Sequence, residues 1–417
     1  MNKELLKQII VENQGFVRDL QIVPRKLFIE ENGNYVFIGA RRSGKSFSMF
    51  QIIKNMLSEN IPLSAILYIN FEDERLMELI GSELGLILDA YREIFSEKPI
   101  LFLDEIQNVD GWEKFARRMA DTGYRIFITG SNAKMLSSEI ATTLGARFLI
   151  KKIFPLSFRE YLQMNNLELE NNWEYSAQRF EIRRMFDGYF YYGGFPELTR
   201  YQEKRMWLES LFQKIFFGDL VARYKIRNDF ALRLMIKKLA ESCQDEVTFN
   251  RIKNILQSAG YKIGTATLIE YMEYLKETWL IYGIKNYHAK ISERETSGKY
   301  YFVDNGILSL FLMNAETILL ENMVACQLKR LYGDGVYYLR SKSEVDFYIT
   351  DNKTLIQVCY RINLAETEKR EVDALISAAQ NVETKEMIVI TLDTEKVLEV
   401  NGFNIRFVPV WKWLLKE

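Results

Sequence analysis

A glycine-rich stretch, GARRSGKS, runs from Gly39 to Ser46 and could bind phosphate. It matches the pattern G-x-x-x-x-G-K-[ST] in full. Glycines let such a loop curl so that its N–H groups point at phosphate oxygens, and a helix beginning at its end adds partial positive charge. We expect Lys45 to reach the β- and γ-phosphates of a nucleoside triphosphate, and Ser46 to ligate Mg²⁺. The predicted nucleotide-contacting residues are Gly39, Ala40, Arg41, Arg42, Ser43, Gly44, Lys45, Ser46 and Phe47.

An acidic pair forms the second half of this predicted site. The run PILFLDE places Asp104 and Glu105 directly after four apolar residues. Such a run is a buried strand, and ligands meet an open parallel sheet at the carboxyl ends of its strands. We expect Asp104 to hold Mg²⁺, directly or through water. Glu105 is the predicted general base, which orients and polarises the attacking water.

Two further residues have two interpretations each. The run YRIFITGSN ends in Thr129, Ser131 and Asn132. Asn132 could bond the γ-phosphate or the water as a catalytic residue, and it could equally cap a helix. Arg147 could act as a finger on the phosphate of a neighbouring subunit, or pair with a surface acid. Arg41 and Arg42 are either near the phosphates or solvated.

Short apolar runs alternate with helix-length segments over the first third of the chain. This alternation, with near-continuous apolar runs, predicts an α/β fold whose parallel sheet is covered by helices on both faces. The predicted strands lie at 35–39, 63–70, 99–105, 124–131 and 147–153, and the predicted helices at 44–58, 85–97, 111–121 and 131–141.

The pattern changes after Phe154-Pro155. Helical patterns rich in aromatics follow, and residues 230–303 suggest three helices and then two strands, which is the layout of a winged helix. From about 318 the pattern mixes helices with strands at 336–340, 344–350, 354–360, 386–392 and 405–409. The predicted domains are 1–155, 156–305 and 306–417.

Composition limits the function classes. The net charge is −1 with a pI near 6.2, so no whole-chain basic excess indicates nucleic acid. Three widely spaced cysteines without a CxxC pair favour a reducing cytoplasm, and a single histidine makes His-rich zinc sites unexpected. No run reaches the ~20 apolar residues that span a bilayer, and the N-terminus lacks the apolar core of a signal peptide. We therefore expect a cytoplasmic protein without membrane contact.

Taken together, several segments resemble the AAA+ superfamily of P-loop ATPases. More narrowly, the chain is similar to a group of bacterial and archaeal ATPases in which a winged helix and a nuclease-like domain follow the P-loop domain. The resemblance implies ATP as the nucleotide, a sensor role near Ser131 and Asn132, and assembly into oligomers. The segments that carry it are RRSGKS, FLDEIQ, ITGSNAKML, PLSFREY, GGFPE, KYYFVDNGI and EVDF.

The C-terminal residues resemble a restriction-endonuclease-like fold that has lost part of its site. Glu321 lies in a helical pattern, and EVDF supplies Glu344 and Asp346. In such nucleases two carboxylates hold a metal and a lysine activates water. Here Gln357 and Cys359 stand where the resemblance expects Glu and Lys. We interpret this domain as an inactive nuclease fold retained for binding or assembly.

Three roles compete for what ATP hydrolysis drives. The first is a nucleotide-gated switch or regulator acting on a protein partner. The second is a DNA-associated ATPase that grips duplex DNA through the winged helix and the nuclease-like fold. Residues 247–302 carry eight Lys/Arg and five Asp/Glu, which is only mildly basic, and the presumed recognition helix carries Glu270, Glu273 and Glu277. The third is an ATP-gated nuclease. We rank them in that order.

Overall fold

The computed structural model describes residues 2–131, 142–294, 297–313, 315–340, 343–362 and 365–416, with only the backbone at 291 and 292. The chain divides into two compact units. Unit 1 is Met1–Phe154 with Glu277–Trp279, and unit 2 is Pro155–Lys276 with Leu280–Glu417. The predicted end of the first domain at 155 therefore lies one residue from the division between the units.

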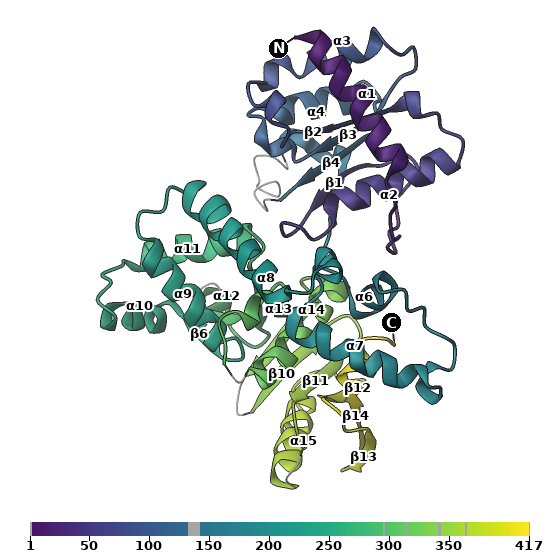
Figure 1. Cartoon of the computed structure of the whole chain (residues 1–417). Coiled ribbons are helices and arrows are strands. Elements are labelled where there is room, and N and C mark those ends of the chain that lie inside the picture. The colour runs from purple at the N-terminus through teal and green to yellow at the C-terminus, as the bar shows by residue number, and fades with distance from the viewer. Residues whose placement is uncertain are drawn as a thin grey trace. The chain divides into compact units, whose positions relative to one another are not determined.

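Unit 1 is built on a five-stranded sheet in the order β2-β3-β4-β1-β5 (Figure 1). All of its strand pairs are parallel. The prediction of a parallel α/β sheet is confirmed, and each strand falls within or one residue from its predicted run. The strands are β1 (Asn34–Ile38), β2 (Ile66–Asn70), β3 (Ile100–Asp104), β4 (Ile126–Gly130) and β5 (Phe148–Lys152).

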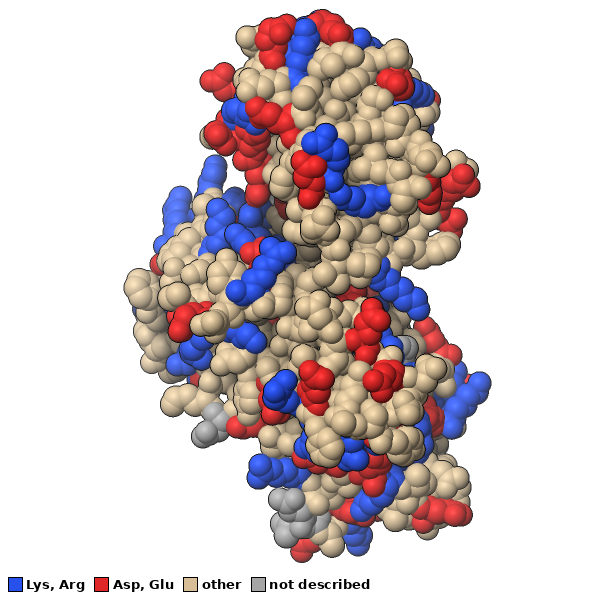
Figure 2. Space-filling view, turned by 45° about the vertical axis from the view of Figure 1, so that its right-hand side comes forward, with Lys and Arg blue, Asp and Glu red and all other residues tan. Residues whose placement is uncertain are grey.

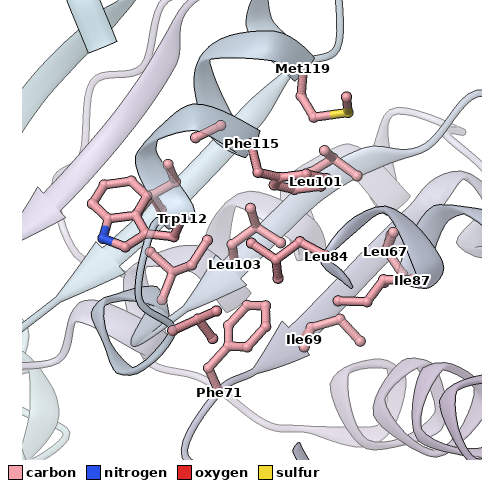
Figure 3. Packing of buried hydrophobic residues seen from close by; sticks show 14 of the residues in the cluster. Leu67, Ile69, Phe71, Leu84, Ile87, Leu101, Leu103, Trp112, Phe115 and Met119 are labelled. Carbon is pink, nitrogen blue, oxygen red and sulfur yellow. The ribbon is translucent and has the colours of Figure 1, made fainter. Parts of the chain in front are cut away.

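Helices cover both faces of this sheet because alternate residues of each strand point to opposite sides. On one face, Leu67, Leu101 and Leu103 pack against α3 and α4, where Figure 3 shows them beside Ile87 and Phe115. On the other face, the alternate strand residues pack against α2. The helices are α1 (Lys3–Asp19), α2 (Lys45–Ser58), α3 (Gly85–Arg92) and α4 (Trp112–Asp121), and the helix predicted at 131–141 lies almost wholly outside the described residues.

Unit 2 is built on a nine-stranded mixed sheet in the order β13-β14-β12-β11-β10-β9-β7-β8-β6. The strands expected after residue 318 are present, and β13 was not anticipated. The strands are β6 (Glu246–Thr248), β7 (Ile281–Asn286), β8 (Ser297–Phe302), β9 (Val336–Arg340), β10 (Glu344–Ile349), β11 (Thr354–Cys359), β12 (Glu386–Thr391), β13 (Lys396–Val400) and β14 (Phe403–Pro409).

The structure does not divide the chain at 305/306, where the sequence suggested a domain boundary. Strand β7 pairs in parallel with β9, so strands from both sides of residue 305 share one sheet. The sequence pattern changes at this position, but both parts belong to unit 2. Pairing between strands that are far apart in the chain cannot be predicted from the local sequence.

Helices of unit 2 precede, interrupt and flank the sheet (Figure 1). The three helices and two strands expected over 230–303 are present as α9, α10, α11, β7 and β8, but β6 lies between α9 and α10 and the short helix α12 (Ile291–Arg294) between β7 and β8. The helices used below are α7 (Gln178–Tyr192), α8 (Lys204–Gln213), α9 (Asp229–Glu241), α10 (Phe249–Ser258), α11 (Thr265–Glu277), α14 (Glu316–Tyr332) and α15 (Ala365–Ala379), with a π-helix, η9 (Lys214–Ala222), directly after α8.

The turn after α7 contains Gly193 and Gly194, which belong to the segment GGFPE. Gly193 has φ +75°, and a Cβ there would lie 1.8 Å from the Oδ1 atom of Asp304. The N–H groups of Gly194 and Gly306 donate to the Asp304 carboxylate at 2.7 and 2.8 Å. The segments GGFPE and KYYFVDNGI therefore meet in space, and glycine is required because the buried carboxylate fills the space of a side chain.

Candidate nucleotide-binding site

The glycine-rich loop lies between the end of β1 and the start of α2, as its sequence predicts. Gly39 has φ +154°, and a Cβ on it would lie 2.1 Å from the backbone oxygen of Ile153. Gly44 has φ +101° where it begins α2. A side chain at Gly39 would collide with backbone, and one at Gly44 would strain the chain, so both glycines are needed for the curl of the loop.

Lys45 points its ammonium into the curl of the loop. Its Nζ atom donates to the backbone oxygens of Gly39 and Ala40 at 3.3 and 3.1 Å, and it lies 3.6 Å from Oε1 of Glu105. The Lys45 side chain is only 3% exposed. A cation held at this point by weak, exchangeable contacts is suited to move onto a phosphate.

Asp104 ends β3 and receives three hydroxyl donors. The Oγ atom of Ser46 donates to Oδ1 at 3.0 Å, the Tyr68 hydroxyl donates to Oδ2 at 2.8 Å, and the Thr129 hydroxyl also donates to Oδ1. Burial and the neighbouring Glu105 charge raise the pKa of the Asp104 carboxyl, which these three donors oppose. A hydroxyl paired with a buried carboxylate is a suitable oxygen-ligand set for Mg²⁺.

Glu105 follows the strand in a left-handed conformation, with φ +51°. Its N–H donates to the Thr129 hydroxyl at 2.8 Å, and its carboxylate accepts from the Ser131 N–H at 3.2 Å and from the Gln107 amide. Burial alone would raise the pKa of this carboxyl, but Lys45 and Gln107 outweigh burial and lower it. The side chain is therefore ionised at neutral pH, which is the form that a general base requires.

Two buried hydroxyls of this site point to a polar ligand. The Oγ atoms of Ser43 and Ser131 are buried, and neither has a hydrogen-bond partner among the residues that the structure describes. Buried polar atoms are rarely left unpaired in proteins. Their position in the loop and at the end of β4 fits a phosphate that would complete their hydrogen bonds.

The other predicted contact residues take different positions. Arg41 pairs with Glu72 at 3.1 Å, and Arg42 lies in the loop with φ +62°. Phe47 lies on α2 with 42% of its surface exposed, and its ring meets the Phe50 ring edge-on at 5.6 Å. Asn132 lies outside the described residues.

Arg147 lies away from this site within its own chain. It comes just before β5, and the Asn34 amide at the start of β1 donates to its backbone oxygen at 3.2 Å. The glycine-rich loop follows the C-terminal end of β1, whereas Arg147 lies beside its N-terminal end. The loop and Arg147 therefore lie at opposite ends of the parallel strands. Its guanidinium pairs with the carboxylate of Asp121 on the surface, which was one of its two predicted roles.

The sequence did not reveal three residues that hold the site together. Tyr68 comes from β2 and Gln107 from the turn after Glu105, while Glu72 pairs with Arg41. Tyr68 belongs to an apolar strand run, so its hydroxyl carries no local signal. Gln107 could have been found, because it belongs to the segment FLDEIQ that supports the resemblance.

A second lysine–acid cluster lies in unit 2 and contains most of the residues that resemble a nuclease. The Nζ atom of Lys299 lies 2.8 Å from Glu344, 3.3 Å from Asp346 and 3.5 Å from Glu321. These four residues line a cavity of about 890 Å³ together with Gln357. The three acids come from α14 and β10, and Lys299 comes from β8. The sequence analysis did not identify Lys299 as a site residue.

The polar groups of this cluster are occupied by one another. The Gln357 amide donates to Glu371 at 2.7 Å, and its oxygen accepts from the Asp346 N–H at 3.2 Å. Burial raises the pKa of the Cys359 thiol to about 11, which keeps it protonated. Across the described residues, no group of three or more His, Cys, Asp and Glu side chains could hold a metal ion. Lys299 therefore pairs with the carboxylates that a nuclease metal would need.

Comparisons with known proteins agree with this geometry. Residues 31–162 match an AAA domain family, and residues 183–317 match a domain of unknown function, DUF8612. The uncharacterized protein MJ1544 of Methanocaldococcus jannaschii is 33% identical over 99% of this chain and 96% of its own length. An uncharacterized protein of Haemophilus influenzae is 30% identical over 90% of this chain and 93% of its own length.

Two solved structures are also similar to the chain. The Walker-type ATPase PABY2304 of Pyrococcus abyssi has a TM-score of 0.41 and 14% identity, over 74% of this chain and 95% of its own. The Orc1 protein of Aeropyrum pernix, solved in complex with DNA, has a TM-score of 0.29 and 13% identity, over 78% of this chain and 94% of its own. In the described part of the chain, no helix has the length and apolar character needed to cross a membrane.

Proposed function

Because the chain belongs to the same protein family as MJ1544 and its N-terminal unit contains an AAA domain, we propose that it is a Mg²⁺-dependent ATPase. The observation that carries the proposal is the chain of contacts from Ser46 to Asp104 and from Lys45 to Glu105, at 3.0 and 3.6 Å. A hydroxyl, a cation and two carboxylates converge at the end of one loop. This set is suited to binding a triphosphate and activating water.

Each residue has a distinct part in the proposed reaction. Lys45 and the N–H groups of the loop bind the phosphates, while Ser46 and Asp104 hold Mg²⁺. When bound, Mg²⁺ offsets the negative charge of the phosphate oxygens. Glu105 accepts a proton from the attacking water at its carboxylate, and Thr129 fixes the backbone of Glu105 for that task. ATP, rather than GTP, rests on the resemblance to AAA-type proteins.

Phosphate release from ATP by the purified protein tests this proposal. We expect Glu105→Gln to lower the rate by about 100-fold or more, because removal of a general base costs that much, while nucleotide binding persists. The matched control is Glu113→Gln on the neighbouring helix α4, which should keep the parental rate. Unchanged hydrolysis in Glu105→Gln, or in Lys45→Ala, would refute the assignment.

We place the use of this activity in a nucleotide-gated switch acting on a protein partner. The two units are separate compact bodies joined at few points along the chain, so ATP bound to unit 1 can bias the position of unit 2. Hydrogen exchange of the backbone amides of unit 2, with and without a non-hydrolysable ATP analogue, would test this coupling. Identical exchange under both conditions would count against a switch.

The second candidate is a DNA-associated ATPase, favoured by the layout of α9, α10, α11 and the β7–β8 pair. This layout supports a winged helix, in which α11 would be the recognition helix. However, Glu270 and Glu273 of α11 are exposed and would repel phosphates. We rank this candidate second for that reason. Absence of salt-dependent duplex binding at low salt would eliminate it.

We infer that the Lys299 cluster has no nuclease activity. Lys299 and Gln357 already engage its carboxylates, so the proposed role of this fold is binding or assembly. A reducing compartment such as the cytoplasm suits the three free thiols of Cys243, Cys326 and Cys359. A finger role for Arg147 would need a second copy of the chain. Within its own copy, Arg147 lies at the opposite end of the parallel strands from the glycine-rich loop.

A further inference from the structure

The segment 204–238 of unit 2 is strongly basic, although the chain as a whole is not. It contains nine Lys/Arg and three Asp/Glu, while the full chain has a net charge of −1. Its basic character also exceeds that of residues 247–302, where eight basic residues face five acids. The positive charge therefore gathers on α8, on α9 and on the connection 223–228 before α9, and not on the presumed recognition helix α11.

Helix α9 presents one exposed stripe of mixed character. Phe230, Arg233 and Lys237 follow each other at spacings of three and four, which places them on one face of the helix. All three are exposed, and Phe230 exposes 67% of its surface. An exposed aromatic ring beside two cations is the combination of side chains that single-stranded nucleic acid uses.

The π-helix η9 continues this stripe. The Arg233 guanidinium lies 4.3 Å from the Phe216 ring centre and 5.7 Å from that of Phe217, so η9 and α9 lie side by side. Phe217 is 49% exposed, and a Cβ on Gly218 would lie 3.8 Å from the side chain of Lys214. Turns of π-helix occur frequently at functional sites. We call Lys214, Phe217, Phe230, Arg233 and Lys237 the basic–aromatic surface.

The cations of this surface are available to a partner. Among the described residues, no carboxylate lies within ion-pair distance of Lys214, Arg233 or Lys237. Asp219 of η9 is engaged elsewhere, since it is buried and pairs with Arg223 at 3.0 Å. Figure 2 shows Lys and Arg side chains gathered over the region where Figure 1 places α8, α9 and α11.

We propose that the basic–aromatic surface binds single-stranded nucleic acid. Lys214, Arg233 and Lys237 would contact phosphates, and unpaired bases would stack on the Phe217 and Phe230 rings. An intact duplex offers phosphates to the cations but keeps its base faces stacked inside. We favour a single strand because its phosphates match the cations and its unstacked bases match the exposed rings.

Fluorescence anisotropy with a labelled oligothymidylate of about 20 nucleotides, and with a duplex of equal length, tests the proposal. The first variant is Phe217→Ala/Phe230→Ala in the full-length protein. We expect it to weaken single-strand binding by at least about fivefold, because each stacked base contributes about 1–3 kcal/mol. Duplex binding should change little. Both rings are exposed, so unchanged thermal unfolding checks that the variant is folded.

The second variant, Arg233→Gln/Lys237→Gln, removes two phosphate contacts. The slope of log affinity against log salt for the single strand should fall by about 1.4, since each contact contributes about 0.7. The matched control, Lys114→Gln/Lys385→Gln, removes the same charge from exposed positions on α4 and before β12 and should leave the slope unchanged. An equal loss in test and control would mean that only overall charge matters, which would overturn the proposal.

Two other results would also overturn it. Equal weakening of single-strand and duplex binding in the phenylalanine variant would exclude stacking. Absence of single-strand binding by the parental protein at low salt would exclude the site. The measurement needs no nucleotide, so Lys45→Ala should bind the oligothymidylate normally. Failure of the ATPase proposal and failure of this inference are therefore distinguishable.

Discussion

Both units bring a buried lysine to acids near the ends of strands, yet they hold it in different ways. In unit 1, Lys45 shares its ammonium between two backbone oxygens and one carboxylate 3.6 Å away. In unit 2, Lys299 lies within 3.5 Å of three carboxylates. The first lysine stands at the start of a helix on a curled loop, whereas the second extends from the interior strand β8.

The difference separates a site that can exchange partners from one that is closed. Lys45 can leave backbone oxygens for phosphate without leaving a charge unpaired. If Lys299 left its position, the buried acids beside it would lose the ammonium that pairs with them. Breaking a buried ion pair in this way costs a large amount of free energy. Burial lowers the pKa of Lys299, but the three neighbouring acids raise it by more. The pKa of Lys299 therefore lies above its ordinary value. Similar residue types therefore fit the proposed chemistry in unit 1 and an architectural role in unit 2.

The largest expected effect comes from Lys299→Met. Removal of the ammonium leaves Glu321 and Asp346 buried beside each other, which should lower the free energy of unfolding of unit 2 by about 3–5 kcal/mol. Urea unfolding measures this, and nucleotide binding by unit 1 should persist. The matched control is Lys329→Met, whose exposed pair with Asp334 should contribute less than about 1 kcal/mol. Equal losses in both variants would erase the contrast between the two lysines.

Asp104→Asn should produce the next largest effect, confined to unit 1. An amide keeps the shape of the side chain but removes the charge that would hold Mg²⁺. We expect the Mg²⁺ concentration for half-maximal ATP hydrolysis to rise about 10–100-fold. Asp121→Asn, which alters the surface partner of Arg147, serves as the control and should leave the Mg²⁺ dependence unchanged. A normal Mg²⁺ response in Asp104→Asn would remove the metal role from this carboxylate.

A pH dependence is also expected in unit 2. Burial, with the charge of Asp346, raises the pKa of Glu321 from 4.5 to about 8 despite Lys299 and the Tyr301 and Gln244 donors. Between these values the folded protein binds a proton that the unfolded chain releases. The Glu321 contribution to the free energy of unfolding is therefore fully present below pH 4.5, and it falls as pH rises to about 8.

Unfolding curves of Glu321→Gln at pH 5 and pH 8 check this sign, because the variant should lose that part of the slope. Tyr301→Phe keeps the carboxyl and removes one hydrogen bond to it, so its slope should keep the parental sign. A parental protein that gains stability from Glu321 as pH rises would contradict the proposed charge balance of the cluster. It would also reduce the proposed difference between the Lys45 site of unit 1 and the Lys299 cluster of unit 2.

The sequence alone determined the sheet of unit 1 and the core of its site. Apolar runs of strand length, separated by helical periods, placed five parallel strands, because strand and helix periodicity are local properties. The loop residues and the pair Asp104–Glu105 were predictable for the same reason, since each lies within one continuous motif.

Tertiary structure alone decided which distant side chains meet. Tyr68 on Asp104, and Lys299 among acids from α14 and β10, join residues far apart in the chain. The joining of β7 to β9 likewise merged two predicted domains into one sheet. Periodicity specifies which face of an element is buried but not the partner it is buried against. That choice depends on the packing of whole elements, which no single segment encodes.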